Sequence, residues 1–154
     1  MVSAQPAKPG ASPYGDLASE PDENGLLLPE GFTSRIIAVG GESVADTGYA
    51  WHAFPDGAAT FPVDDGGWIY TCNSEVTALF APDQGGVSAI RFDADGEVVD
   101  AYRILEGSTS NCAGGPTPWG TWMSCEEPID KRGRLWECDP TGKKKAVAHE
   151  AMGL

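Results

Sequence analysis

Short runs in which apolar and polar residues alternate recur along the chain from residue 35 onwards, each bounded by Gly, Pro, Asn or Asp. A period of two is typical of a half-buried β-strand, and the bounding residues are typical of turns. No stretch has the sustained 3.6-residue period of a helix, so we expect at most one short helical turn. The pattern indicates an all-β sandwich, barrel or propeller fragment. Its strands are predicted at residues 35–39, 68–72, 87–92, 98–104, 119–125, 135–138 and 145–148.

The most unusual stretch is residues 111–127, which read NCAGGPTPWGTWMSCEE. Pro116 and Pro118 lack amide donors and favour extended backbone before them, so the first half is predicted to be a shaped loop. The second half alternates large apolar with small or polar residues and predicts a strand that ends at Glu126 and Glu127. Adjacent strand residues point to opposite faces, so one of these carboxylates is expected to face inward, where it favours a cation.

Two further patterns, one of aromatic residues and one around a proline, give local predictions. We expect Trp119 and Trp122 to pack in the core rather than to contact a substrate, because paired aromatics on a strand usually fill a core. Pro55-Asp56-Gly57 is predicted to be a turn.

The charge of the chain limits its partners. The sequence has 10 Lys and Arg against 23 Asp and Glu, a formal net charge of −13. A nucleic-acid partner is therefore not expected, because phosphate binding needs a basic face. Acidic chains suit divalent cations, although solubility alone also accounts for the charge. No segment has the ~20 apolar residues of a membrane-spanning helix.

The four cysteines have no CxxC spacing and no neighbouring His cluster, which gives no support to a structural zinc site. In an oxidising compartment Cys112 and Cys125 could form a disulfide, and the alternative is that they are small buried apolar residues. Residues 1–24 are rich in Pro, Ala, Ser, Gly and acids and are predicted to form a flexible arm before a domain at residues 25–154.

Three motifs carry a resemblance to a known family: NCAGGPTPWGTWMSCEE, GYAWHAFPDGAATF at residues 48–61, and NSEV at residues 73–76. Together they closely resemble the PhoX-type alkaline phosphatases, in the shorter branch of that family. The resemblance implies a β-propeller of antiparallel blades, of which this chain would be an incomplete, N-terminal portion. It also implies export by the twin-arginine route to the periplasm or outside the cell, although the leader is absent from this chain.

The resemblance further implies an activity, the hydrolysis of phosphate monoesters by a cluster of calcium and iron ions. Glu75 matches the position of a family metal-binding Glu and, like Glu126, is expected at a strand end. We therefore expect Glu75 and Glu126 to be metal ligands on the same side of the structure, with Glu127 as the next candidate. The alternative is that these are solvated acids at strand ends.

One departure from the family concerns iron. Longer members have a cysteine that bridges two irons where this chain reads Tyr49-Ala50-Trp51-His52, which weighs against iron. His52 is either a substitute ligand or a hydrogen-bonded structural residue. Asn111 and Thr117 are expected to organise the loop through hydrogen bonds from side chain to backbone.

The sequence thus leaves two functions from different classes. The first is part of a phosphoric monoester hydrolase acting on a phosphate monoester, with no catalytic residue assigned. Because the resemblance places further ligands after Leu154, the 154-residue chain alone is expected to show little or no turnover. The second is a calcium-binding propeller scaffold or binding module of an exported protein, without catalysis. The sequence does not determine the substrate, the metals or the oligomeric state.

Overall fold

The computed structural model describes residues 10–77, 79–81, 84–127 and 133–150, so the first nine residues of the predicted arm lie outside it. The described residues fall into two compact units, one ending at Ile37 and the other beginning at Ala38. The predicted strands belong to the second unit, apart from the first part of residues 35–39.

The first unit is held by one bridge and one carboxylate. Leu17 and Pro29 form an isolated antiparallel bridge. Asp22 accepts hydrogen bonds from the amides of Asn24 and Leu26 at 3.0 and 2.8 Å. These contacts tie the second half of the predicted arm to the residues that follow it.

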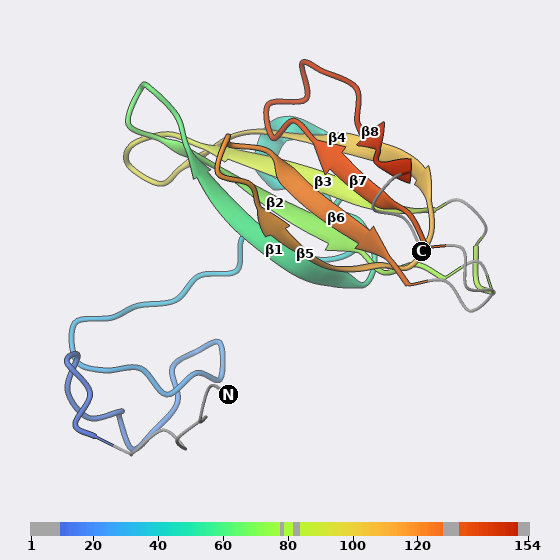
Figure 1. The fold of residues 1–154 in the computed structure, drawn as a ribbon. Coiled ribbons are helices and arrows are strands. Elements are labelled where there is room, and N and C mark those ends of the chain that lie inside the picture. The colour runs from blue at the N-terminus through green and yellow to red at the C-terminus, as the bar shows by residue number, and fades with distance from the viewer. Residues whose placement is uncertain (1–9, 78, 82–83, 128–132, 151–154) are drawn as a thin grey trace, which may run out of the picture. The chain divides into compact units, whose positions relative to one another are not determined.

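The first sheet of the second unit is a simple antiparallel meander (Figure 1). It is preceded by a single 3-10 turn, η1 (Ala45–Thr47), and its strands run in the order β1-β2-β3-β4. Tight turns join β1 to β2 and β3 to β4, with Gly66 and Gly96 at φ values of 87° and 84° that favour glycine. The strands are β1 (Pro55–Pro62), β2 (Trp68–Ser74), β3 (Gly85–Phe92) and β4 (Val98–Ser108).

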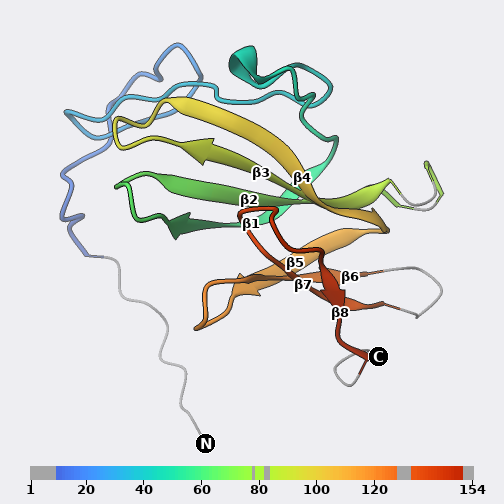
Figure 2. The same ribbon diagram turned by 90° about the horizontal axis from the view of Figure 1, so that it is seen from above.

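The second sheet repeats this arrangement in the order β5-β6-β7-β8, again antiparallel throughout. Figure 2 shows the two sheets as two stacked layers, and close backbone approach confirms the stacking. A Cβ atom built on Gly57 of β1 would lie 2.4 Å from the carbonyl oxygen of Cys112 in β5, so that glycine permits the contact. The strands are β5 (Asn111–Pro116), β6 (Trp122–Glu126), β7 (Leu135–Cys138) and β8 (Val147–Ala148).

The core lies between the two layers. Its largest fully buried side chain is Trp122, which is 1% exposed, whereas Trp119 is 69% exposed. The prediction that both tryptophans pack in the core is therefore right for Trp122 and wrong for Trp119. The reason is that Trp119 falls in the β5–β6 turn, where its Nε1 donates a hydrogen bond to Glu137 at 2.6 Å. The core consists of Phe61, Ile69, Val87, Ala89, Ile104, Leu105, Trp122 and Cys138.

Two strands appear where turns or loops were predicted. Residues 55–57 begin β1 rather than forming a free turn, with a register shift between Pro55 and Ala58. The expected loop at residues 111–116 is β5, in which Pro116 pairs with Trp122. Both are edge strands, and proline is tolerated there because one side of the strand needs no amide donor.

The predicted strand at residues 35–39 is wrong, since these residues have no strand hydrogen bonding. Ile36 is 69% exposed and Val39 is 44% exposed. A segment of alternating apolar residues forms a strand only when a neighbouring strand pairs with it through backbone hydrogen bonds. No such strand pairs with residues 35–39 in the described part of the chain.

The all-β class is confirmed, because both sheets are antiparallel and the described helical structure is one 3-10 turn. Neither sheet closes on itself, and two stacked meanders do not establish a propeller. Among the described residues, no helix is long and apolar enough to cross a membrane.

Candidate functional site

The ends of three strands meet where the predicted acidic residues lie. The amide of Ser110, just before β5, donates to the carbonyl of Val76, just after β2, at 2.9 Å. The carbonyl of Ser110 in turn accepts from the amide of Glu127, just after β6, at 2.8 Å. Glu75 and Glu127 therefore follow strand ends that are tied together by backbone hydrogen bonds.

The side chain of Cys112 contacts one of these acids, Glu127, and the charge of the other, Glu75, reaches it. Its thiol donates to Oε2 of Glu127 at 3.2 Å. Burial raises the pKa of the Cys112 thiol, and the hydrogen bond to Glu127 and the negative charges of Glu127 and Glu75 raise it further. The charges of both carboxylates thus favour the neutral form of one thiol. We call Glu75, Cys112 and Glu127 the carboxylate–thiol cluster.

Glu126 points away from this cluster. Its Oε1 accepts a hydrogen bond from Nε1 of Trp136 at 3.0 Å, and its Oε2 accepts one from the amide of Arg134 at 2.9 Å. Both donors belong to β7 or the residue before it, so the carboxylate of Glu126 turns toward β7 while that of Glu127 turns toward Cys112. This divergence is the one that strand alternation predicts for adjacent residues.

A buried asparagine fixes β5 and β6 against the first sheet. Nδ2 of Asn73 donates to the carbonyls of Cys112 and Ala113 at 2.8 and 3.0 Å. Its Oδ1 accepts from Nε1 of Trp122 at 2.9 Å and from the hydroxyl of Ser124 at 2.8 Å. Asn73 is fully buried and uses all of its ordinary hydrogen-bonding capacity, so it sets the position of the segment that carries Cys112.

The two residues expected to organise the loop lie at opposite ends of the β5–β6 hairpin. Asn111, which pairs with Glu126, is buried; it accepts from the hydroxyl of Ser108 at 2.6 Å and donates to that of Ser124 at 2.9 Å. Its partners are thus side chains rather than backbone. Thr117 accepts from the amide of Thr121 at 3.0 Å within the β5–β6 turn. Thr117 therefore shapes the turn and is not brought to the carboxylate–thiol cluster.

His52 is buried with both ring nitrogens engaged. Nε2 lies 2.9 Å from the carbonyl of Asn73 and must donate to it, so Nδ1 accepts from the hydroxyl of Ser88 at 2.7 Å. The hydroxyl of Ser88 also lies 2.8 Å from that of Tyr49 and 3.2 Å from Nη1 of Arg103. Of the two roles that the sequence leaves open for His52, this arrangement favours the structural one.

The protein is expected to lose stability as the pH falls through the titration range of His52. Burial lowers the pKa of His52 from 6.5 to about 4, and the positive charge of Arg103 adds to this effect. Between these values the unfolded state binds more protons, so acid favours unfolding. At about 1.4 kcal/mol per pKa unit, the loss from pH 7 to pH 4 is on the order of 3 kcal/mol.

Urea denaturation at several pH values between 4.5 and 7 checks this prediction. The variant His52→Gln should show a flatter dependence of the free energy of unfolding on pH, whatever its stability at pH 7. His149→Gln is the matched control, because His149 is partly exposed and pairs with Glu137. If the free energy of unfolding depended on pH equally in wild type and His52→Gln, the pH dependence would not come from His52.

The described residues do not by themselves supply a complete metal site. No three side chains of His, Cys, Asp or Glu in that part of the chain come together as ligands of one ion. All four cysteines are free thiols, and the possible pairing of Cys112 with Cys125 is not formed. Iron accepts thiolate and carboxylate donors and calcium accepts carboxylate oxygens, so the contacting pair Cys112 and Glu127 fits part of a ligand set rather than a whole one.

In metal-free protein, Glu127→Gln is expected to make Cys112 more reactive. Removing the adjacent negative charge lowers the pKa of the thiol and raises its thiolate fraction, so alkylation by iodoacetamide at pH 8 should speed up several-fold. Peptide mass spectrometry measures each cysteine separately. Cys125 is an internal reference, because burial alone raises the pKa of its thiol. An unchanged rate at Cys112 would show that Glu127 does not act on it.

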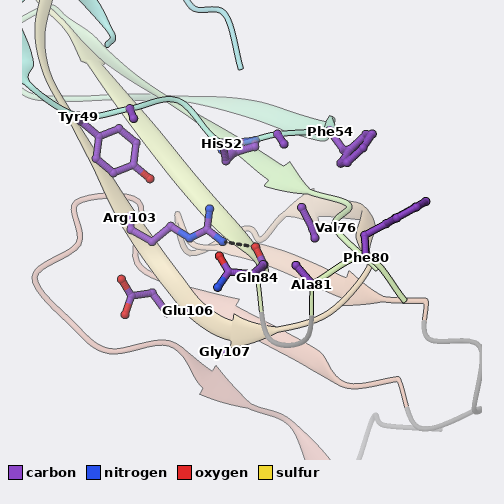
Figure 3. Close-up of a pocket in the computed structure, with 12 residues that line it drawn as sticks. Tyr49, His52, Phe54, Val76, Phe80, Ala81, Gln84, Arg103, Glu106 and Gly107 are labelled. Atoms are coloured by element: carbon purple, nitrogen blue, oxygen red, sulfur yellow. Dashed lines mark hydrogen bonds between the residues drawn. The ribbon is translucent and has the colours of Figure 1, made fainter. Parts of the chain in front are cut away.

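A pocket of about 960 Å³ opens beside the His52 network, and His52, Phe54 and Val76 are among the residues that line it (Figure 3). Its floor includes Arg103, whose guanidinium donates to the carbonyls of Leu105, Gln84 and Gly85. Sequence reasoning missed Arg103, Asn73 and Cys112 as parts of a site. No local pattern marks these residues, because their hydrogen-bond partners are distant in the sequence. Asn73 and Ser124, for example, are 51 residues apart.

The comparisons with known proteins give one match. The family model described as alkaline phosphatase PhoX matches residues 84–151. No curated protein and no solved structure matches the chain. The matched segment begins just before β3 and extends past β8, so it contains Cys112, Glu126 and Glu127 but not His52 or Glu75. Over residues 84–151, which are less than half of its length, this chain is therefore similar to the PhoX alkaline phosphatase family, which is consistent with the resemblance of the motif at residues 111–127.

Proposed function

We propose that this chain is part of a metal-dependent phosphomonoesterase of the PhoX type. The observation that carries the proposal is the family match over residues 84–151, which suggests a phosphatase-related function. The segment includes Glu127, which accepts a hydrogen bond from the Cys112 thiol, and the charge of Glu75 at the end of β2 also acts on that thiol. This supports the proposal that Glu75, outside the matched segment, belongs with Glu127, inside it.

The proposed metals are calcium and iron, with Glu75 and Glu127 as ligands. Calcium takes six to eight oxygen ligands, so this pair would share an ion with oxygens from other residues. Cys112 supplies beside them the soft donor that is missing at residues 49–52, and this favours iron. Glu126 stays a proposed ligand, because a carboxylate oxygen that accepts one hydrogen bond keeps a second lone pair. Bound metal would supply Lewis acidity toward a phosphoryl oxygen.

The residues of this chain would then act by positioning. Asn73 holds the carbonyls of Cys112 and Ala113, and therefore the backbone from which the thiol projects. The hydrogen bond between Asn111 and Ser124 holds β5 and β6 together where Asn111 pairs with Glu126. Because these bonds are buried or partly buried, the ends of the strands are kept in place without a ligand. The location proposed for such an enzyme is periplasmic or extracellular, after twin-arginine export.

Hydrolysis of p-nitrophenyl phosphate by the complete product of the reading frame tests the proposal. We expect turnover that is lost on removal of metal by a chelator and restored by calcium, with or without iron. The scaffold alternative makes a different prediction: calcium would raise the melting temperature, but no phosphate ester would be hydrolysed. A protein that calcium stabilises but that hydrolyses none of several phosphate esters would therefore overturn the proposal that it is a phosphatase.

A further inference from the structure

Two exposed phenylalanine rings form one wall of the pocket in Figure 3. The rings of Phe54 and Phe80 stack with their centroids 6.2 Å apart and their planes 20° apart. Phe54 is nevertheless 57% exposed and Phe80 is 79% exposed. Val76 and Ala81 extend the same apolar wall. Stacked rings that stay open to water offer a planar apolar surface, which a second aromatic group can cover.

The backbone of Phe54 is held in an unfavourable conformation beside a candidate metal ligand. Its φ is 50°, in the left-handed region that a bulky residue rarely adopts. Its carbonyl accepts a hydrogen bond from the amide of Glu75 at 2.9 Å. The aromatic wall is thus joined directly to the segment that carries Glu75.

The polar side of the pocket limits what can enter. Arg103 makes four hydrogen bonds to Ser88 and to three carbonyls, so its guanidinium is fixed in the floor and largely committed to protein groups. The exposed carboxylate of Glu106 lines the pocket as well and disfavours an anionic group near it. The metal proposed at the carboxylate–thiol cluster would offset the negative charge there, so a phosphate monoester would place its phosphoryl group toward that cluster and an uncharged group against the rings.

We propose that this pocket binds the uncharged aromatic leaving group of an aryl phosphomonoester, an inference that rests on the proposed function for the phosphoryl end. The aromatic group stacks on Phe54 and Phe80, and its oxygen points toward the strand end that carries Glu75. Aryl esters are thus preferred over small aliphatic ones.

Equilibrium dialysis of the complete product of the reading frame tests the binding step. The probes are 1-naphthyl phosphate, 1-naphthol and inorganic phosphate. Loss of one stacking partner in Phe80→Ala should weaken binding of both naphthyl compounds about tenfold and leave phosphate unaffected. Phe32→Ala is the matched control, because Phe32 is 50% exposed and belongs to the first unit. Failure of the naphthyl compounds to bind wild type, or equal binding by Phe80→Ala, would overturn the inference.

Rates of hydrolysis test the preference for aryl esters independently of the proposed phosphatase function. The ratio of kcat/KM for 1-naphthyl phosphate to that for glycerol phosphate should fall about tenfold in Phe80→Ala, through KM. An unchanged ratio in an active enzyme would overturn the aryl preference while the phosphatase stands. If neither ester is hydrolysed, the proposed function fails, and the dialysis experiment still decides whether the pocket binds the aromatic group.

Discussion

Replacement of Asn73 by alanine is expected to destabilise the protein by about 3–5 kcal/mol. The substitution leaves two part-buried groups without this partner, the carbonyls of Cys112 and Ala113, and two buried groups, Nε1 of Trp122 and the hydroxyl of Ser124. Each unsatisfied buried group costs about 1–3 kcal/mol, and local relaxation recovers part of the sum. Urea denaturation at pH 7 measures the loss.

The matched control for this prediction is Thr109→Val. The Thr109 hydroxyl is also buried, but it has no hydrogen-bond partner in the described part of the chain. Its removal should leave stability unchanged or slightly increased, because a buried hydroxyl without a partner contributes nothing. If Asn73→Ala and Thr109→Val had similar effects, the Asn73 network would not be what joins the two sheets.

Truncation of Trp122 to alanine is expected to have a comparable effect, about 3–5 kcal/mol. Trp122 is the largest fully buried side chain, it lies between the two layers, and its ring also donates to Asn73. The change therefore leaves a cavity and removes a buried hydrogen bond together. Thermal and urea unfolding followed by circular dichroism would measure it.

Trp119→Ala provides the comparison within the same motif. Trp119 is 69% exposed, and its hydrogen bond to Glu137 lies at the surface, so its loss should cost less than about 1 kcal/mol. Equal destabilisation by the two substitutions would contradict the position of Trp122 in the core.

The strands that alternate clearly were predictable, and those that contain proline were not. β2, β3, β4 and β7 lie where the period-two pattern predicts them, because their apolar faces meet one common core. The prolines at the start of β1 and in β5 instead predict a turn and a loop. Proline excludes a segment from the middle of a sheet but not from its edge. The local sequence does not determine whether a strand lies in the middle or at the edge.

The candidate site shows the same limit. The place of Glu75, Glu126 and Glu127 at strand ends could be predicted, since they follow β-rich runs in recognisable motifs. Their orientation could not, because it depends on partners brought together by folding. Glu126 is held by Arg134 and Trp136, and Glu127 by Cys112, fifteen residues away.

The central claim is that Glu75 and Glu127 act together in a phosphomonoesterase site. The most direct test is kcat for p-nitrophenyl phosphate at saturating calcium, measured for Glu75→Gln, Glu127→Gln, the double variant and the exposed control Glu42→Gln in the complete product of the reading frame. Each single substitution is expected to lower kcat by about 100-fold or more, and the double variant little further, because ligands of a shared site act as a unit. Glu42→Gln should match wild type. Full activity in either single variant would contradict the claim.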